Sequence, residues 1–141
     1  MAQCELCHAQ GETVLWQNEN CRVILVNDDD YPGFCRVIWQ QHTKEMTDLK
    51  PDDQQTIMHV VFAVEQAIRE VMQPDKINLA SLGNMTPHLH WHVIPRYVDD
   101  SHFPNPVWGK PQRKFVCLTS TERIPEDWQI RLDTRIKQIL N

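Results

Sequence analysis

Three histidines alternate with apolar residues near position 90 of this chain. The segment from His88 to Arg96 reads HLHWHVIPR, with a histidine at every second position of its first five residues. Because successive side chains of a β-strand point to opposite faces, His88, His90 and His92 are expected on one face of a sheet. The apolar residues between and after them would be buried on the other face and fix the register of the strand: Leu89, Trp91 and Val93.

This histidine face has three interpretations. The residues can be polar groups on the wet side of a sheet, or ligands of a catalytic zinc or iron. The third is nucleophilic catalysis on phosphorus, since a neutral imidazole near pH 7 is both a competent nucleophile and a tolerable leaving group. The strict alternation of three histidines favours the third interpretation.

A second group with chemical potential is the C-x-x-C pair of Cys4 and Cys7. Such a pair binds zinc when two more ligands are supplied, or acts as a redox pair at the start of a helix in a βαβ unit. No strand is predicted before residue 4, which favours zinc over redox chemistry.

The elements that position these residues are predicted from periodicity and turn signals. Apolar residues recur at helical spacing after Pro51, with Asp52 and Asp53 in the first turn, and this helix ends before Pro74. A second helix follows Pro125 and spans Trp128 to Leu140. The predicted strands are Thr13–Gln17, Cys21–Asn27, Phe34–Gln40, Lys76–Leu82, His88–Pro95 and, as a further candidate, Phe115–Leu118. The fold class is therefore α+β, with antiparallel strands and a long helix packed on one face.

Composition excludes several classes of protein. The 141 residues carry a net charge of -5 and 41% hydrophobic residues, which argues against disorder and against a surface that coats nucleic acid. The four glycines are too far apart for either common glycine-rich phosphate loop. Apolar runs are far shorter than the roughly 20 residues of a membrane span. Five cysteines without a signal-peptide pattern are typical of reduced thiols, and we expect a cytoplasmic protein.

The histidine run resembles the signature of the histidine triad (HIT) superfamily of nucleotide hydrolases and transferases. Two further anchors carry the resemblance: the segment from Pro32 to His42, and Gly83-Asn84 five residues before His88. The resemblance is strongest over residues 4–97, with a proline-rich loop and a C-terminal extension over 98–141. It implies one HIT domain over residues 1–141 and a HIT-like fold.

The resemblance implies a reaction and a structural metal. His90 would attack the α-phosphate of a dinucleoside polyphosphate or a nucleoside 5′-phosphoramidate and form a nucleotidyl-histidine intermediate, and His92 would stabilise the phosphoryl oxygens. Zinc-containing relatives imply a structural zinc with no part in bond cleavage, and His8 is a competing ligand for it. The implied zinc ligands are Cys4, Cys7, His42 and His88.

Three asparagines complete the expected nucleotide site. By resemblance, Asn27 would bind the ribose hydroxyls, Asn84 the phosphate or leaving group, and Asn78 the wall of the same pocket, although each also fits a turn or an edge of the sheet. Phe34 and Met85 depart from the family's usual histidine and hydroxyl residues, which leaves the leaving group open.

The sequence leaves two further points open. The protein can be an enzyme, or a nucleotide-binding or sensing module with negligible turnover. Trp108 can stack on a base, or it can form a subunit contact. The resemblance also implies a homodimer. The acidic composition and the short apolar runs lead us to expect that the protein binds no nucleic acid and no membrane.

Overall fold

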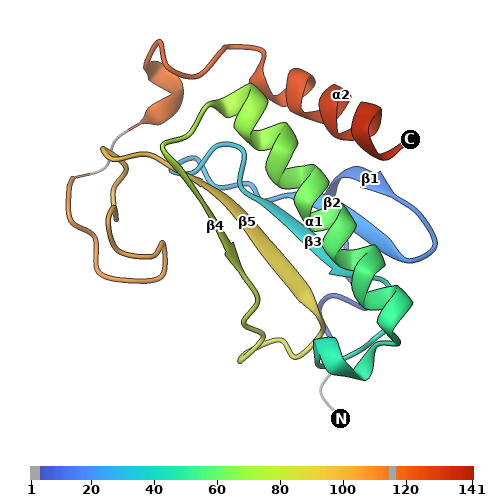
Figure 1. The fold of residues 1–141 in the computed structure, drawn as a ribbon. Coiled ribbons are helices and arrows are strands. Elements are labelled where there is room, and N and C mark those ends of the chain that lie inside the picture. Colours follow the sequence, from blue (N-terminus) through green and yellow to red (C-terminus); the bar gives the residue numbers. More distant parts are fainter. Residues whose placement is uncertain (1–3, 115–116) are drawn as a thin grey trace.

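The computed structural model describes residues 4–114 and 117–141. Five antiparallel strands form one sheet in the order β1-β2-β3-β5-β4, and a long helix crosses one face of it (Figure 1). The strands are β1 (Thr13–Gln17), β2 (Cys21–Leu25), β3 (Cys35–Trp39), β4 (Lys76–Ala80) and β5 (His90–Arg96). The helices are α1 (Pro51–Met72) and α2 (Trp128–Leu140), with short 3₁₀ turns at Met46–Asp48 and Leu118–Ser120. In the described part of the chain, no helix combines the length and the apolar character needed to cross a membrane.

Helix α1 packs on the sheet because one side of it is apolar. Its side chains at helical spacing are buried, among them Ile57, Val64 and Ile68. They pack against the inward residues of β3 and β5, including Val37 and Val93. Helix α2 lies beside α1 (Figure 1) and contributes Leu132 and Ile136 to the same core. The structure confirms the predicted α+β fold, and both helices lie on one side of the sheet.

The predicted strand over His88–Pro95 begins too early. Strand β5 starts at His90, because the backbone N–H of His88 donates to the carbonyl of Thr86 and that of Leu89 to the carbonyl of Thr43. The alternation therefore applies to His90 and His92, whereas His88 lies in the preceding loop. Of the candidate strand over Phe115–Leu118, residues 115 and 116 lie outside the described residues, and Leu118 begins a 3₁₀ turn.

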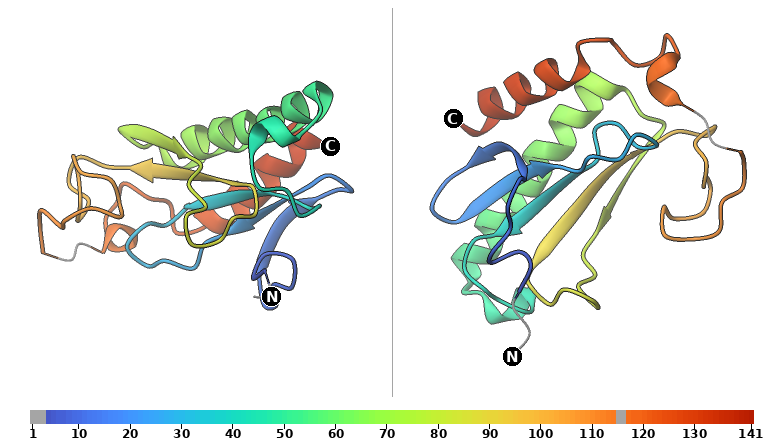
Figure 2. Two further views of the ribbon diagram at one scale, coloured as in Figure 1. Left: turned by 90° about the horizontal axis from the view of Figure 1, so that it is seen from below. Right: turned by 180° about the vertical axis from the view of Figure 1, so that it is seen from behind.

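The face of the sheet opposite α1 carries the two strand histidines. Antiparallel pairing places His90 opposite Ile38 and His92 opposite Arg36. The N-terminal segment lies at one end of β5 and the loop after Arg96 lies at the other end (Figure 2). Strand β5 therefore carries the histidines between two irregular segments that approach from opposite ends.

Candidate functional site

His90 is held by the backbone that precedes it. Its Nδ1 lies 2.6 Å from the carbonyl oxygen of His88, and the residue is only 8% exposed. Because a carbonyl oxygen can only accept a hydrogen bond, Nδ1 carries the proton and Nε2 keeps its lone pair. A neutral imidazole in this tautomer can attack an electrophile through Nε2.

His92 is surrounded by two aromatic rings and a guanidinium. Its ring centroid lies 4.9 Å from that of His90, 5.7 Å from that of Phe34 and 4.9 Å from that of Trp108. Arg36 Nε donates to His92 Nδ1 over 3.4 Å. Burial, the neighbouring His90 and the charge of Arg36 lower the pKa of His92 from its usual value to about 4. His92 is therefore neutral at physiological pH.

A cavity of about 200 Å³ opens beside His90. Its lining includes Lys44, Glu45, Ser81 and Gly83, so one ammonium group, one carboxylate and a glycine-containing loop border the cavity. Ser81 Oγ also donates to the carbonyl oxygen of His90 over 2.8 Å. The cavity next to His90 is therefore polar and carries charges of both signs.

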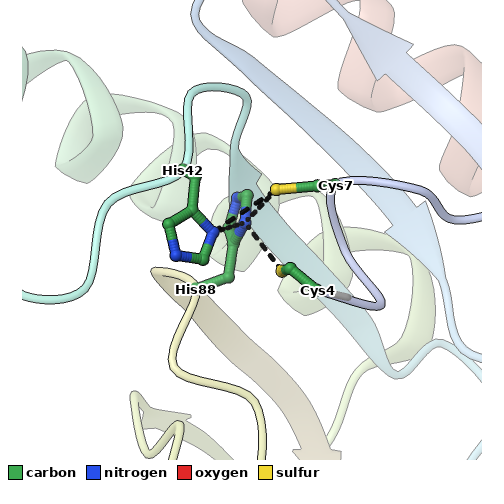
Figure 3. A group of neighbouring side chains, drawn as sticks. All are labelled: Cys4, Cys7, His42 and His88. Atoms are coloured by element: carbon green, nitrogen blue, oxygen red, sulfur yellow. Dashed lines mark hydrogen bonds between the residues drawn. The ribbon is translucent and has the colours of Figure 1, made fainter. Parts of the chain in front are cut away.

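The four residues expected to bind metal converge at the start of β5 (Figure 3). The ligand atoms of Cys4, Cys7, His42 and His88 all lie within 4.8 Å of one another. Sγ of Cys7 is 3.3 Å from Nδ1 of His42 and 3.4 Å from Nδ1 of His88, and Sγ of Cys4 is 3.4 Å from Nδ1 of His88. Ligands at Zn–S of about 2.3 Å and Zn–N of about 2.0–2.1 Å in a tetrahedron are separated by roughly 3.3–3.8 Å. The donor set and its spacing therefore fit a four-coordinate metal ion.

Hydrogen bonds within the protein orient these candidate ligands. Nε2 of the buried His88 lies 2.6 Å from the carbonyl oxygen of Trp39, which places the proton on Nε2 and leaves Nδ1 free for a metal. Burial lowers the pKa of His88, which favours the neutral form that a metal requires. Arg22 fixes the turn between the cysteines by donating to the carbonyl oxygen of Leu6 over 2.7 Å. The site is thus assembled from three separate segments of the chain.

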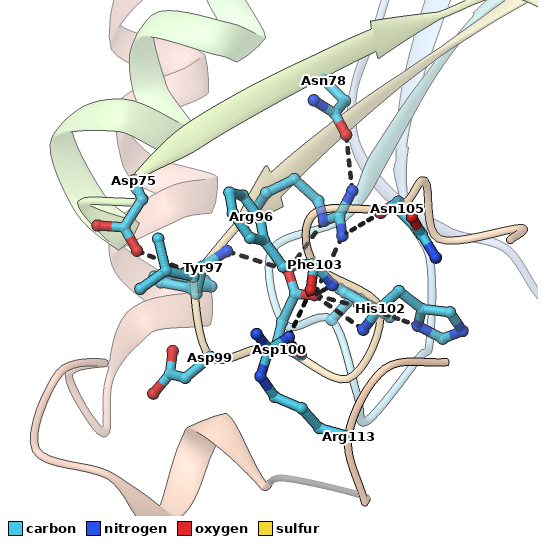
Figure 4. A network of polar contacts seen from close by, with 12 residues as sticks. Asp75, Asn78, Arg96, Tyr97, Asp99, Asp100, His102, Phe103, Asn105 and Arg113 are labelled. Carbon is cyan, nitrogen blue, oxygen red and sulfur yellow. Dashed lines mark hydrogen bonds and ion pairs between the residues drawn. The ribbon is translucent and has the colours of Figure 1, made fainter. Parts of the chain in front are cut away.

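The opposite end of β5 is fastened by a buried ion pair (Figure 4). Arg96 Nε donates to Asp100 Oδ2 over 2.9 Å, and the two side chains are 2% and 0% exposed. Arg96 also donates to Asn78 Oδ1 and to the carbonyl oxygen of Asn105. Burial alone would raise the pKa of Asp100, but hydrogen bonds from Arg96 and from the backbone of Tyr97 and Phe103 hold it below its ordinary value.

This ion pair shapes the loop that reaches the histidines. Asp100 accepts hydrogen bonds from the backbone N–H groups of His102 and Phe103, and Arg113 donates to the carbonyl oxygens of Asp100 and Phe103. These hydrogen bonds hold the loop so that Trp108 lies against His92, and Trp108 is still 51% exposed. Neither Arg96 nor Asp100 was predicted from the sequence, since a pair of charges four residues apart is ordinarily a solvated feature and only burial reveals its role.

The three asparagines of the expected nucleotide site are not brought together. Asn27 is exposed and lines a separate cavity of about 300 Å³ with Pro32 and Trp128, and this cavity shares no lining residue with the one beside His90. Asn78 is half-buried, with its carbonyl oxygen engaged by Arg96. Asn84 is exposed in the loop between β4 and β5. Their assignment to a nucleotide stays a prediction.

Comparisons with known proteins agree with this arrangement. The model of the HIT domain family matches residues 9–99. The asymmetrical bis(5′-nucleosyl)-tetraphosphatase of Schizosaccharomyces pombe is 27% identical over 106 residues, which are 68% of this chain and 58% of that protein. The chain thus spans less than two thirds of the length of this relative.

Two solved structures share the fold. A histidine triad protein from Marinobacter aquaeolei is 28% identical, with a TM-score of 0.71 over 99% of this chain and 95% of that chain. A zinc-bound histidine triad family protein from Mycobacterium smegmatis is 21% identical, with a TM-score of 0.62 over 95% and 90% of the two chains. The family match covers most of the chain and includes His90, His92 and two of the four clustered residues that could hold a metal, so the chain belongs to the HIT domain family.

Proposed function

We propose that the protein is a nucleotide hydrolase or transferase that works through covalent catalysis at His90. The observation that carries this proposal is the bond from His90 Nδ1 to the carbonyl of His88, which leaves Nε2 unprotonated in a residue that lines a cavity. Family membership and the likeness to a tetraphosphatase support a nucleotide as the substrate. The substrate classes to test are dinucleoside polyphosphates and nucleoside 5′-phosphoramidates.

The proposed reaction has two displacements. His90 Nε2 attacks the α-phosphorus, the bond from phosphorus to the leaving oxygen or nitrogen breaks, and the leaving group takes up a proton from solvent. Water then attacks the same phosphorus and breaks the P–N bond to His90, which returns the electron pair to Nε2. A nucleoside monophosphate leaves, and the proton lost by the water returns to solvent. His92 would stabilise the charge that develops on the phosphoryl oxygens, as electrostatic phosphoryl-transfer sites do. By the family resemblance, Asn27, Asn78 and Asn84 are proposed to contact the nucleotide.

Intact-protein mass spectrometry tests the mechanism. Wild-type protein and His90→Ala are mixed with a member of each substrate class and quenched without acid, because a phosphoramidate adduct is acid-labile. We expect a nucleotidyl adduct on the wild type and none on the variant, with turnover lost in His90→Ala and folding retained. Tight nucleotide binding without adduct or product would instead identify a binding or sensing module, and equal activity in the variant would refute the mechanism.

We infer that the four-residue cluster holds zinc in a structural role. The support is the close approach of two sulfur and two nitrogen atoms, all within 4.8 Å of one another, together with the zinc-bound relative of the same fold. With all four positions filled by protein, the ion would organise the N-terminal segment and the start of β5, and bond cleavage would depend on His90 and His92. Elemental analysis of freshly purified protein tests the identity and stoichiometry of the metal.

The assembly is proposed from the family resemblance, and the location and the absence of other partners are proposed from the composition. We propose a single HIT domain over residues 1–141 that forms a homodimer in the cytoplasm and binds neither nucleic acid nor membranes. Strand β4 lies at the edge of the sheet, where a second copy would find backbone groups to pair with. Light scattering after gel filtration at two protein concentrations measures the oligomeric state.

A further inference from the structure

Arg36 has an unusual environment for a charged residue. It lies in β3 directly opposite His92, on the face of the sheet that carries the histidines. Burial lowers the pKa of its guanidinium, which Glu12 partly offsets, and an arginine stays charged even so. Glu12 is itself bound by Arg22 at 2.8 Å. None of the ion pairs among the described residues includes Arg36.

The hydrogen bond from Arg36 determines where His92 carries its proton. A guanidinium has five donors and no acceptor, so the ring nitrogen that faces it must offer a lone pair. That nitrogen is Nδ1, 3.4 Å from Arg36 Nε. A neutral imidazole has one protonated nitrogen, and the proton of His92 is therefore on Nε2.

The two neighbouring imidazoles then have opposite tautomers. His90 faces a carbonyl oxygen, which requires Nδ1–H and leaves Nε2 as a nucleophile. His92 faces a guanidinium, which leaves Nε2–H as a donor. The ring centroids are only 4.9 Å apart, so a nucleophilic nitrogen and a hydrogen-bond donor lie side by side on β5.

We propose that Arg36 is the positioning residue for His92, holding it as a neutral imidazole whose Nε2–H donates to the oxygens of the reacting phosphate. The identity of the acceptor as a phosphate oxygen rests on the proposed function, whereas the tautomer of His92 does not. Arg36 also adds a positive charge close to the site without forming a fixed salt bridge there. Without the guanidinium, His92 would lose the partner that distinguishes its two tautomers.

Nitrogen-15 NMR of the histidine rings tests the tautomer without requiring turnover. The metal-loaded wild type is compared at pH 7 with Arg36→Met, which keeps the chain length but removes the donor, and with Arg36→Lys, which keeps a donor and the charge. We expect Nε2–H in the wild type, a mixture of both tautomers in Arg36→Met, and substantial recovery of Nε2–H in Arg36→Lys. Nδ1–H in the wild type, or an unchanged tautomer in Arg36→Met, would overturn the proposal.

Kinetics then separate positioning from simple destabilisation. One donor to developing negative charge is typically worth about 10²–10³ in kcat, so partial misplacement of the proton in Arg36→Met should lower kcat by at least about 10-fold. KM should change by less than about 3-fold, and Arg36→Lys should recover part of kcat. A change in KM alone, with kcat unaltered, would contradict the positioning role.

A replacement variant and the independence of the NMR measurement from turnover allow the role of Arg36 to be decided in each case. If Arg36→Met fails to fold, Arg36→Gln replaces it, because an amide can turn either its donor or its acceptor toward Nδ1 and should also give mixed tautomers. If the wild type turns nothing over, the proposed function fails while the NMR result still decides the role of Arg36. Conversely, an active enzyme with an unchanged His92 tautomer in Arg36→Met would remove only this inference.

Discussion

The two ends of β5 are fastened by different chemistry. At its start, two thiols and two imidazoles surround a space that fits a metal ion, and at its end a buried arginine and aspartate hold a loop. Both devices act next to the candidate catalytic pair, since His88 precedes His90 by two residues and the loop carries Trp108 onto His92. One end of the strand is therefore suited to an ion from solution, whereas the other is held by the protein's own charges.

The difference concerns what each end depends on. The proposed zinc site requires deprotonated thiols and an ion, so it should respond to chelators, oxidation and pH. The pair of Arg96 and Asp100 requires only that its carboxylate stay charged, which the lowered pKa of Asp100 favours. Perturbing one end of β5 at a time should therefore show separately how His90 and His92 are positioned.

The largest effect is expected from breaking the ion pair. Asp100→Ala leaves Arg96 as an uncompensated buried charge and removes the acceptor of several backbone N–H groups, which should lower the free energy of unfolding by about 3–5 kcal/mol. Urea denaturation measures this loss. Asp99→Ala, at a neighbouring exposed carboxylate, is the matched control and should cost less than about 0.5 kcal/mol. Equal losses in the two variants would show that burial of the pair is not what matters.

The same pair predicts the direction of acid sensitivity. Because the pKa of Asp100 is lower in the folded state than in the unfolded chain, its contribution is complete above the unfolded value of about 3.9 and is lost as the pH falls further. Stability measured from pH 5 downward should therefore decline less steeply in Asp100→Asn than in the wild type. Parallel curves would assign the acid sensitivity to other carboxyl groups.

Removing the metal should have an intermediate effect on stability. An ion present at 100 times its dissociation constant stabilises the folded state by about 2.7 kcal/mol, so a chelator should lower the melting temperature by the corresponding amount. Cys7→Ser should abolish both the bound metal and this response. His8→Ala removes a neighbouring exposed histidine outside the cluster and should keep one metal per chain. Loss of metal in His8→Ala would instead make His8 a ligand.

The smallest effect is expected at the contact between Trp108 and His92. Burial is the main reason that the pKa of His92 is about 4, and Trp108→Ala uncovers the ring, so its pKa should rise toward the usual value of about 6.5. Stability should change little, because Trp108 is half-exposed. Proton NMR titration of the His92 ring measures the shift, and Trp128→Ala, a tryptophan at the start of α2, controls for loss of an aromatic residue. A pKa that stays near 4 would mean that the sheet alone buries His92.

Much of the framework was predictable because it depends on local patterns. The apolar repeat after Pro51 predicted α1 to within a residue or two, and β-prone runs bounded by turn residues predicted all five strands. The error at His88 has a physical cause: alternation continues through the sequence, but the backbone there is bonded to Thr86 and Thr43. A side-chain pattern does not reveal where a ladder of hydrogen bonds begins.

The sequence by itself determined the α+β fold and the C-x-x-C pair, because these rest on residue types at characteristic spacings. The resemblance to the HIT family then implied His42 and His88 as the other two residues of the candidate metal site. Tertiary structure alone decided the environments. It buried Arg96 with Asp100, set Arg36 opposite His92, separated Asn27 from the cavity at His90, and brought Trp108 onto β5. The physical reason is that burial, strand register and tautomer depend on which distant segments pack together. The spacing of residues along the chain reveals such packing only where a function requires a fixed pattern of residue types.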